Sequence, residues 1–133
     1  MAPKNSVDAV VTFRNLHNWI GPQMDTIFQN SYKALKPGGI FGVVEHRAKD
    51  GTSLDAMKKS GYVTEDYAIS IAKKHGFVLV EKSEINANPK DLKNYEGGVW
   101  TLPPSLRLKD KDKQKYLGIG ESDRMTLLFK KPE

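Results

Sequence analysis

The 133-residue chain contains no cysteine. That absence excludes disulfide bonds, zinc sites built from thiolates and cysteine nucleophiles. No apolar run approaches the roughly 20 residues that a membrane-spanning helix needs. The first six residues also lack the apolar stretch of a signal peptide. We therefore expect a cytoplasmic protein that does not insert into a membrane.

The chain also lacks a concentrated patch of one charge, although its net charge is +5. Its lysines are scattered or alternate with aspartate, as in residues 109–115, which read Lys-Asp-Lys-Asp-Lys-Gln-Lys. Interleaved charges are typical of a solvated loop, whereas nucleic-acid binding needs a clustered basic surface. We expect no nucleic-acid partner.

Four short runs of apolar and β-branched residues predict strands. They cover residues 7–13, 40–45, 77–81 and 124–130. The first two runs show little alternation with polar residues, which is typical of strands buried on both faces.

Helical patterns lie between these strands. Residues 24–35 place apolar side chains at helical spacing, and residues 64–76 begin with a threonine N-cap and end with glycine. Residues 54–59 predict a short helix. Lys-Pro-Gly-Gly at residues 36–39 predicts a type II turn that ends the first long helix. The alternation of strand and helix predicts an α/β fold with parallel first strands.

Residues 84–121 form a long connection with several prolines and no sustained period. Connections of this length in a compact domain are usually functional or disordered. Because Tyr95, Trp100 and Leu102 give the segment enough apolar surface to pack, we predict an ordered flap. The flap and the α/β elements together form a single predicted domain, residues 1–133.

The order of these elements around Leu35-Lys36-Pro37-Gly38-Gly39 resembles the C-terminal half of class I S-adenosylmethionine-dependent methyltransferases. In that family the turn before the fifth strand commonly reads Leu-Lys-Pro-Gly-Gly, and the preceding strand often begins with aspartate, here Asp8. Residues 12–19, 83–90, 98–104 and 120–125 look like one uncharacterised bacterial branch of predicted methyltransferases. The resemblance implies a truncated Rossmann-like sheet flanked by helices. Its implied strand order is 4-5-7-6 in the family's numbering, with the last strand antiparallel.

The resemblance also implies S-adenosylmethionine as the cofactor. The family's glycine-rich turn and acidic ribose ligand have no counterpart in this sequence, since Gly118-Ile119-Gly120 lacks a third glycine and a preceding strand. We therefore assign no cofactor-binding residue and hold two hypotheses. The chain is a methyltransferase whose cofactor site a partner completes, or it is a non-catalytic dimerising half-domain or the product of a truncated gene.

The first predicted strand would pair on both sides in a full methyltransferase sheet. Ala9 to Phe13 carries no charge and no proline to protect an open edge. We predict a homodimer in which this strand pairs with its copy across a two-fold axis. The alternative is a separate chain that supplies the missing half.

Candidate site residues follow the carboxyl ends of the first two strands, where open α/β sheets bind ligands. We predict His17, Arg14 and Asn15 as catalytic, with His17 as the general base, because histidine titrates near neutral pH. Arg14 or Arg47 would bind a carboxylate or phosphate. The predicted substrate-binding residues are Trp19, Glu45, His46, Arg47, Tyr62 and Trp100.

Structural roles compete with these assignments. Asn15 suits a cap of the following turn, Trp19 suits the core beneath the helix, and His75 suits a helix end. Glu45 with Arg47 suits an ordinary ion pair.

Neighbouring residues of a strand point to opposite faces, so we expect Glu45 and His46 not to line the same cleft. The spacing of His17, Glu45 and His46 matches no compact metal-ligand motif. We therefore predict no metal site.

Overall fold

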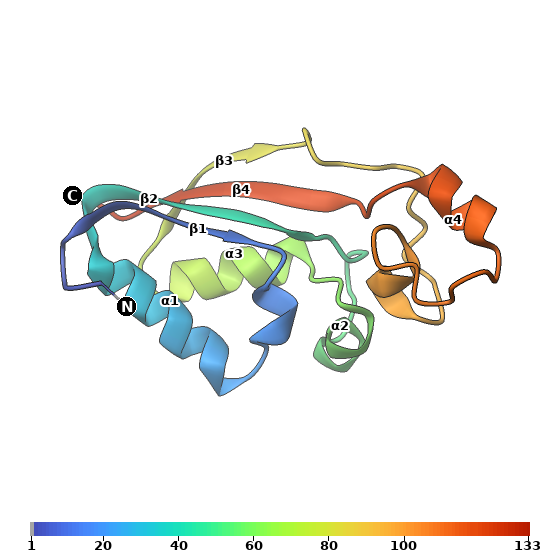
Figure 1. Ribbon diagram of the computed structural model, residues 1–133. Coiled ribbons are helices and arrows are strands. Elements are labelled where there is room, and N and C mark those ends of the chain that lie inside the picture. The colour runs from blue at the N-terminus through green and yellow to red at the C-terminus, as the bar shows by residue number, and fades with distance from the viewer. Residues whose placement is uncertain (1) are drawn as a thin grey trace.

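A computed structural model describes residues 2–133 and contains one mixed four-stranded sheet (Figure 1). The strands are β1 (Val7–Phe13), β2 (Leu35–His46), β3 (Val78–Ser83) and β4 (Arg124–Lys130). Their order is β1-β2-β4-β3. β1 and β2 are parallel, and β4 lies antiparallel to both of its neighbours. The predicted α/β fold and strand order, with an antiparallel last strand between the second and third, are confirmed.

Two longer helices cover one face of this sheet (Figure 1). The helical elements in chain order are η1 (Leu16–Asn18), α1 (Pro22–Ala34), α2 (Leu54–Ser60), α3 (Glu65–Lys74), η2 (Gly98–Thr101) and α4 (Lys113–Ile119). The covering helices are α1 and α3, whereas α2 and α4 lie toward the end of the sheet at which β1 and β2 finish. No helix of residues 2–133 combines the length and apolarity needed to cross a bilayer.

Local capping chemistry sets the ends of these helices. Pro22 occupies the first turn of α1, where its missing N–H costs nothing. The Thr64 hydroxyl accepts a hydrogen bond from the Tyr67 amide at the start of α3, and Gly76, with φ of 95°, follows the other end. These caps match the sequence prediction, which placed threonine and glycine at the two ends of this helix.

We predicted that the turn at residues 36–39 precedes the second strand, but these residues lie inside β2. Gly38 has φ of 82°, which suits the third position of a type II turn. The chain nevertheless stays in the sheet, because the Gly38 amide donates to the Lys131 carbonyl at 2.8 Å. A register shift in β1 between Val7 and Ala9 accommodates the extra residues. The turn sequence therefore produces an irregularity within a long strand.

The main core lies between the sheet and helices α1 and α3. Phe41 of β2 is 1% exposed, and its ring lies 5.2 Å from that of Phe28 in α1 and 5.0 Å from that of Phe77. Phe129 of β4 lies on the same side, 6.4 Å from Phe41. This aromatic cluster holds the helices against the strands.

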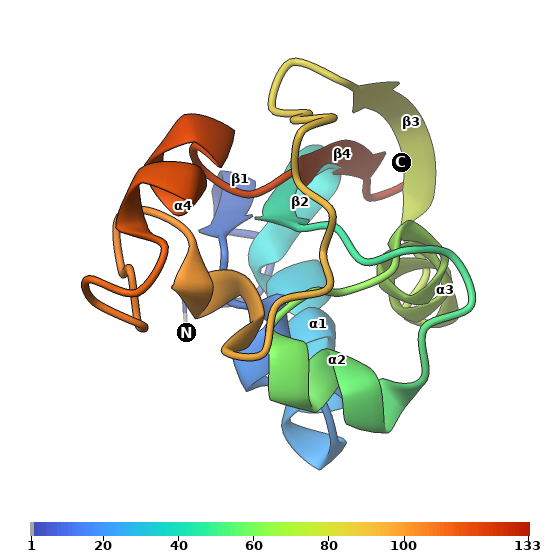
Figure 2. The same ribbon diagram turned by 90° about the vertical axis from the view of Figure 1, so that its right-hand side faces the viewer.

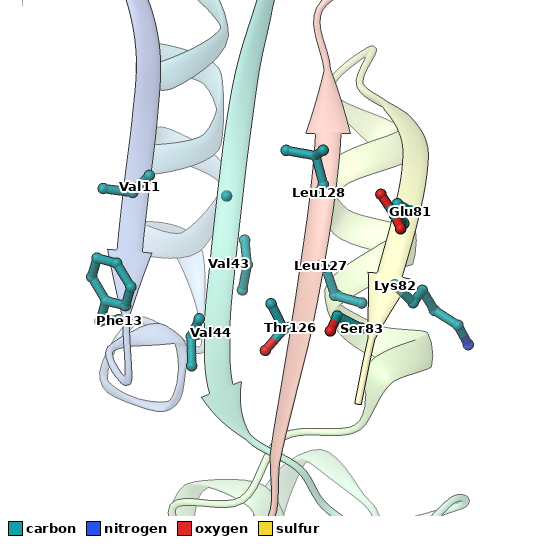
Figure 3. Close-up of a pocket in the computed structure, with 11 residues that line it drawn as sticks. Val11, Phe13, Val43, Val44, Glu81, Lys82, Ser83, Thr126, Leu127 and Leu128 are labelled. Atoms are coloured by element: carbon teal, nitrogen blue, oxygen red, sulfur yellow. The ribbon is translucent and has the colours of Figure 1, made fainter. Parts of the chain in front are cut away.

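The opposite face of the sheet has no helix over it among residues 2–133 (Figure 1). Figure 3 shows Val11, Phe13, Val44 and Leu128 on this face, around an apolar hollow of about 290 Å³. Val11 and Phe13 are each 57% exposed. The prediction that the first strand is buried on both faces is therefore wrong, because the described chain provides a cover for only one face.

Residues 84–121 carry η2 and α4 and pass beyond the end of β2 (Figure 2). The Asn88 side-chain amide donates to the carbonyls of Ile119 and Glu121, both at 2.7 Å. Asp91 accepts hydrogen bonds from the Tyr62 hydroxyl and the Asp123 amide, both at 2.9 Å. These contacts join the first part of the connection to the residues at its end and to the loop before α3.

We predict that Phe41→Ala lowers the free energy of unfolding by about 3 to 5 kcal/mol, because it leaves a cavity in the aromatic cluster. Denaturant unfolding measures the change. Leu92→Ala is the control, since Leu92 is 55% exposed and should cost at most about 0.5 kcal/mol. Equal losses for the two variants would contradict this account of the core.

Candidate functional site

A polar cleft of about 410 Å³ lies beyond the carboxyl ends of the parallel strands β1 and β2. The turn after β1 and the end of β2 form part of its wall, and the η2 segment contributes Val99 and Trp100. Its polar side chains include Arg14, Asn15, His17, His46, Ser122 and Arg124. The structure thus brings all three residues predicted as catalytic into one cleft.

Glu45 is the most deeply buried charged group at this site, with 0% of its surface exposed. Its carboxylate accepts hydrogen bonds from the backbone amides of His17 and His46, both at 2.8 Å. The His17 Nδ1 atom lies 3.0 Å from the same carboxylate. Burying a carboxylate is costly unless it is paired and hydrogen-bonded. Glu45 therefore fixes both the position and the ring orientation of His17.

His46 is the second imidazole of the cleft, and its ring centroid lies 5.5 Å from that of His17. Its Nδ1 atom makes a 2.5 Å hydrogen bond with the Ser122 hydroxyl. Burial first, and then electrostatic interaction with the neighbouring His17, Arg124 and Arg14, lowers the pKa of His46 to about 3. His46 is therefore a neutral imidazole at physiological pH, with one ring nitrogen left after the bond to Ser122.

The expectation that Glu45 and His46 do not line the same cleft agrees with the structure. His46 lines the cleft, whereas Glu45, which we predicted to bind substrate, is fully buried and does not line it. Glu45 accepts a hydrogen bond from the amide of His46 itself, so its carboxylate bends back toward the end of β2. His17, Glu45 and His46 each place one potential ligand atom within 4.8 Å of the others. These three side chains could hold a metal ion.

Arg14 follows β1 in the left-handed backbone region, with φ of 58°. Its amide donates to the Val44 carbonyl at 2.7 Å, which ties the turn to β2. Among residues 2–133 its exposed guanidinium forms no ion pair, so it is available to an anionic ligand. Asn15 occupies the N-cap position of η1 but makes no side-chain capping bond, so the predicted cap is wrong.

Arg124 and Ser122 are cleft residues that the sequence reasoning missed. Arg124 donates to Ser122 at 3.2 Å and to Glu121 at 2.9 Å. The signal was present, because an antiparallel β4 must begin where β1 and β2 end. The predicted strand order therefore places the first residues of the last strand beside the cleft.

Of the three aromatic residues predicted to bind substrate, one lines the cleft and two lie outside it. Trp100 lines the cleft, with its ring 5.8 Å from that of His17. Trp19 is half-buried, packs against the main core and lines a different hollow together with Ile27. Tyr62 is buried, and its hydroxyl donates to Asp91; burial and the Asp91 charge raise the pKa of Tyr62. Trp19 and Tyr62 thus lie outside the cleft, because the core and the connection take them up.

Arg47 points away from the cleft, and its predicted ion pair with Glu45 is wrong. Its guanidinium donates to Asp123 at 2.9 Å, to Glu65 at 2.7 Å and to Glu84 at 2.8 Å. Burial by itself would raise the pKa of Asp123, but hydrogen bonds from Arg47 and Lys93 lower it to about 2. Arg47 joins the end of β2 to α3 and to both ends of the long connection.

No family model matches the chain, and no curated protein matches its sequence. Solved structures do share its fold. The 4+2 cyclase SpnF has 17% identity and a TM-score of 0.65, over 98% of this chain and 52% of SpnF. Phosphoethanolamine N-methyltransferase 2 from Haemonchus contortus, solved with S-adenosylmethionine, has 20% identity and a TM-score of 0.60, over 100% of this chain and 35% of the enzyme.

The N-methyltransferase NodS from Bradyrhizobium japonicum is a further similar structure, with 16% identity and a TM-score of 0.58. That match covers 100% of this chain and 55% of NodS. At these identities the likeness concerns the fold alone, which is that of S-adenosylmethionine-dependent methyltransferases. The chain spans about half the length of SpnF and NodS and about a third of the Haemonchus enzyme.

We predict that Asp123→Asn lowers the free energy of unfolding at pH 7 by about 2 kcal/mol, because it removes charge-assisted hydrogen bonds. The stability that Asp123 contributes is present above its unfolded pKa of 3.8 and is lost as pH falls through its folded pKa of about 2. The difference in unfolding free energy between wild type and variant should therefore shrink as the pH falls from about 5 to about 2. Chemical denaturation across this range measures it. Asp50→Asn, at an exposed turn, is the control, and a gap that stays constant down to the lowest pH would contradict the prediction.

Proposed function

We propose that this chain contributes the acceptor-binding part of an S-adenosylmethionine-dependent methyltransferase and that the methyl acceptor binds in the polar cleft. The observation that supports this most directly is the buried Glu45 carboxylate beside the His17 ring. A buried carboxylate that orients an imidazole is the arrangement by which enzymes prepare a histidine to accept a proton. The cleft also lies where α/β sheets usually bind ligands.

In this proposal His17 is the general base. Because Glu45 accepts a hydrogen bond from Nδ1, the Nε2 atom is left with a free lone pair. The acceptor N–H or O–H would give its proton to Nε2 of His17, which leaves a lone pair on the acceptor nitrogen or oxygen. The unpaired Arg14 binds an anionic group of the acceptor, and Asn15 and Trp100 contact its remaining surface.

The methyl group would come from S-adenosylmethionine held with the help of another polypeptide. The described residues do not fit this cofactor alone, because no glycine-rich turn links a parallel strand to a helix between residues 2 and 133. Gly21 precedes α1 but follows the short η1, and Gly120 follows α4. We therefore assign no cofactor-binding residue to this chain.

A homodimer through Ala9 to Phe13 is the partner arrangement that we propose. The outer edge of β1 pairs with no strand among residues 2–133, and that segment carries no charge. The other edge strand, β3, carries Glu81 and Lys82, which oppose edge-to-edge pairing. A separate chain that pairs with β1 and covers the apolar face is the alternative.

The second candidate function is a non-catalytic dimerising half-domain. The observation that favours it is the uncovered apolar face beside the open edge of β1 (Figure 3). This hypothesis requires the dimer, but it predicts neither ligand binding nor catalysis in the cleft. Ligand binding and methyl transfer therefore separate the two candidates.

We expect His17→Gln to reduce methyl transfer by about 100-fold to 10,000-fold, the usual contribution of a general base. The assay follows radioactive methyl incorporation from S-adenosylmethionine into a bacterial small-molecule extract. His75→Gln is the matched control, because His75 contacts Asp25 away from the cleft. No transfer by the wild type, with no calorimetric binding of S-adenosylmethionine or S-adenosylhomocysteine at millimolar concentration, favours the non-catalytic half-domain.

We expect the wild type to be a dimer in size-exclusion chromatography with light scattering. Val11→Lys should produce monomers, because it places a charge on the edge strand β1. Val80→Lys on β3 is the control with nearly the same exposure, 54% against 57%, and should remain dimeric. A monomeric wild type would rule out the dimer, and monomers from Val80→Lys alone would place the interface at β3.

A further inference from the structure

Two imidazoles that line the cleft, His17 and His46, lie close to the buried carboxylate of Glu45. His17 belongs to η1, while Glu45 and His46 are the last two residues of β2. One nitrogen or oxygen atom from each lies within 4.8 Å of the others. We propose that these three side chains bind one divalent transition-metal ion, of which Zn²⁺ is the representative.

The distances suit such an ion after a small adjustment. Two ligand atoms at about 2.1 Å from a tetrahedral metal lie roughly 3.4 Å apart. The His17 Nδ1 atom and the Glu45 carboxylate, at 3.0 Å, are already close to that separation. No two of the three ligand atoms are more than 4.8 Å apart, so no gap must close by more than roughly 1.4 Å. Side-chain rotation at the end of a strand provides a movement of this size.

The carboxylate has room for the ion. Ionised glutamate offers about four acceptor positions. Backbone amides of His17 and His46 occupy two of them. A metal between Glu45 and His17 would replace the proton that joins them, and the charge of the ion would compensate the buried carboxylate.

His46 is prepared as the third ligand. A metal-bound imidazole usually has its other nitrogen hydrogen-bonded, which fixes the ring. Ser122 makes that bond to Nδ1 of His46, so Nε2 is the nitrogen that remains for the ion.

The donor set determines which ions bind. Two imidazoles and one carboxylate favour Zn²⁺, Co²⁺ or Fe²⁺ over Mg²⁺ and Ca²⁺, which prefer oxygen ligands. Three protein ligands leave a coordination position for a small molecule. That position would face the cleft, where Arg14 and Trp100 also lie. This part of the inference rests on the proposed function: an acceptor group bound to the ion would release its proton to solvent water more readily, and His17 would then be a ligand instead of the base.

The test is a titration of the metal-free wild type with Co²⁺, followed by visible absorption and calorimetry. We expect one Co²⁺ per chain, the intense absorption of a four- or five-coordinate ion, displacement by Zn²⁺ and no competition from Mg²⁺. His17→Asn and His46→Asn should each weaken binding by at least about 100-fold. His75→Asn removes the only other histidine and should leave affinity unchanged.

X-ray absorption of the Zn²⁺-loaded wild type provides a measurement that requires no variant to fold, and we expect two imidazole ligands. Absence of Co²⁺ binding, or an affinity that falls with His75→Asn and not with the cleft variants, would overturn the proposal. The titration uses neither cofactor nor acceptor, so its result is independent of the methyl-transfer assay. A failed titration with a methyl-transfer loss in His17→Gln would leave His17 as the general base without a metal.

Discussion

The buried carboxylate of Glu45 is the constraint on which the cleft depends. A charge with no exposed surface must find its partners within the protein. Glu45 finds them in two backbone amides and one imidazole. Because one amide and the imidazole belong to His17, the turn after β1 is held against the end of β2. The left-handed backbone of Arg14 lies in that turn, so the same carboxylate also determines where this guanidinium enters the cleft.

The sheet imposes a second constraint. A sheet with apolar side chains on both faces needs a layer on each side. Helices α1 and α3 supply one layer, and the aromatic cluster around Phe41 joins them to the strands. Val11, Phe13 and Leu128 face the other side, where the described chain supplies no layer (Figure 3). The cleft is therefore built from the chain's own residues, whereas the second sheet face has no covering layer among residues 2–133.

Sequence reasoning succeeded where structure is decided locally. The first and last strands occupy the predicted residues, and the caps at Thr64 and Gly76 depend only on side chains close to the helix ends. It failed where distant residues decide. Arg47 is bound by carboxylates 18, 37 and 76 positions away, a distribution that no local pattern reveals.

The candidate site shows the same division. Strand order sufficed to bring His17, Arg14 and Asn15 into one cleft, because the carboxyl ends of parallel strands meet at one edge. The alternation rule also held at the end of β2, since His46 lines the cleft and Glu45 does not. Tyr62 was assigned to the substrate because its partner, Asp91, lies in a connection whose path has no periodic signal.

Phe13 connects the incomplete face with the cleft. It lines the apolar hollow over the sheet and also the polar cleft, and it immediately precedes Arg14. A strand paired with β1, or a layer placed over Val11, would therefore contact the mouth of the cleft through Phe13. Such a partner would reduce the access of water to His17 and strengthen the interaction between Arg14 and an anionic ligand, because both would lie in a less polar environment. Association through β1 and ligand binding in the cleft are thus physically coupled in the arrangement that we propose, whether the partner is a second copy or a different chain.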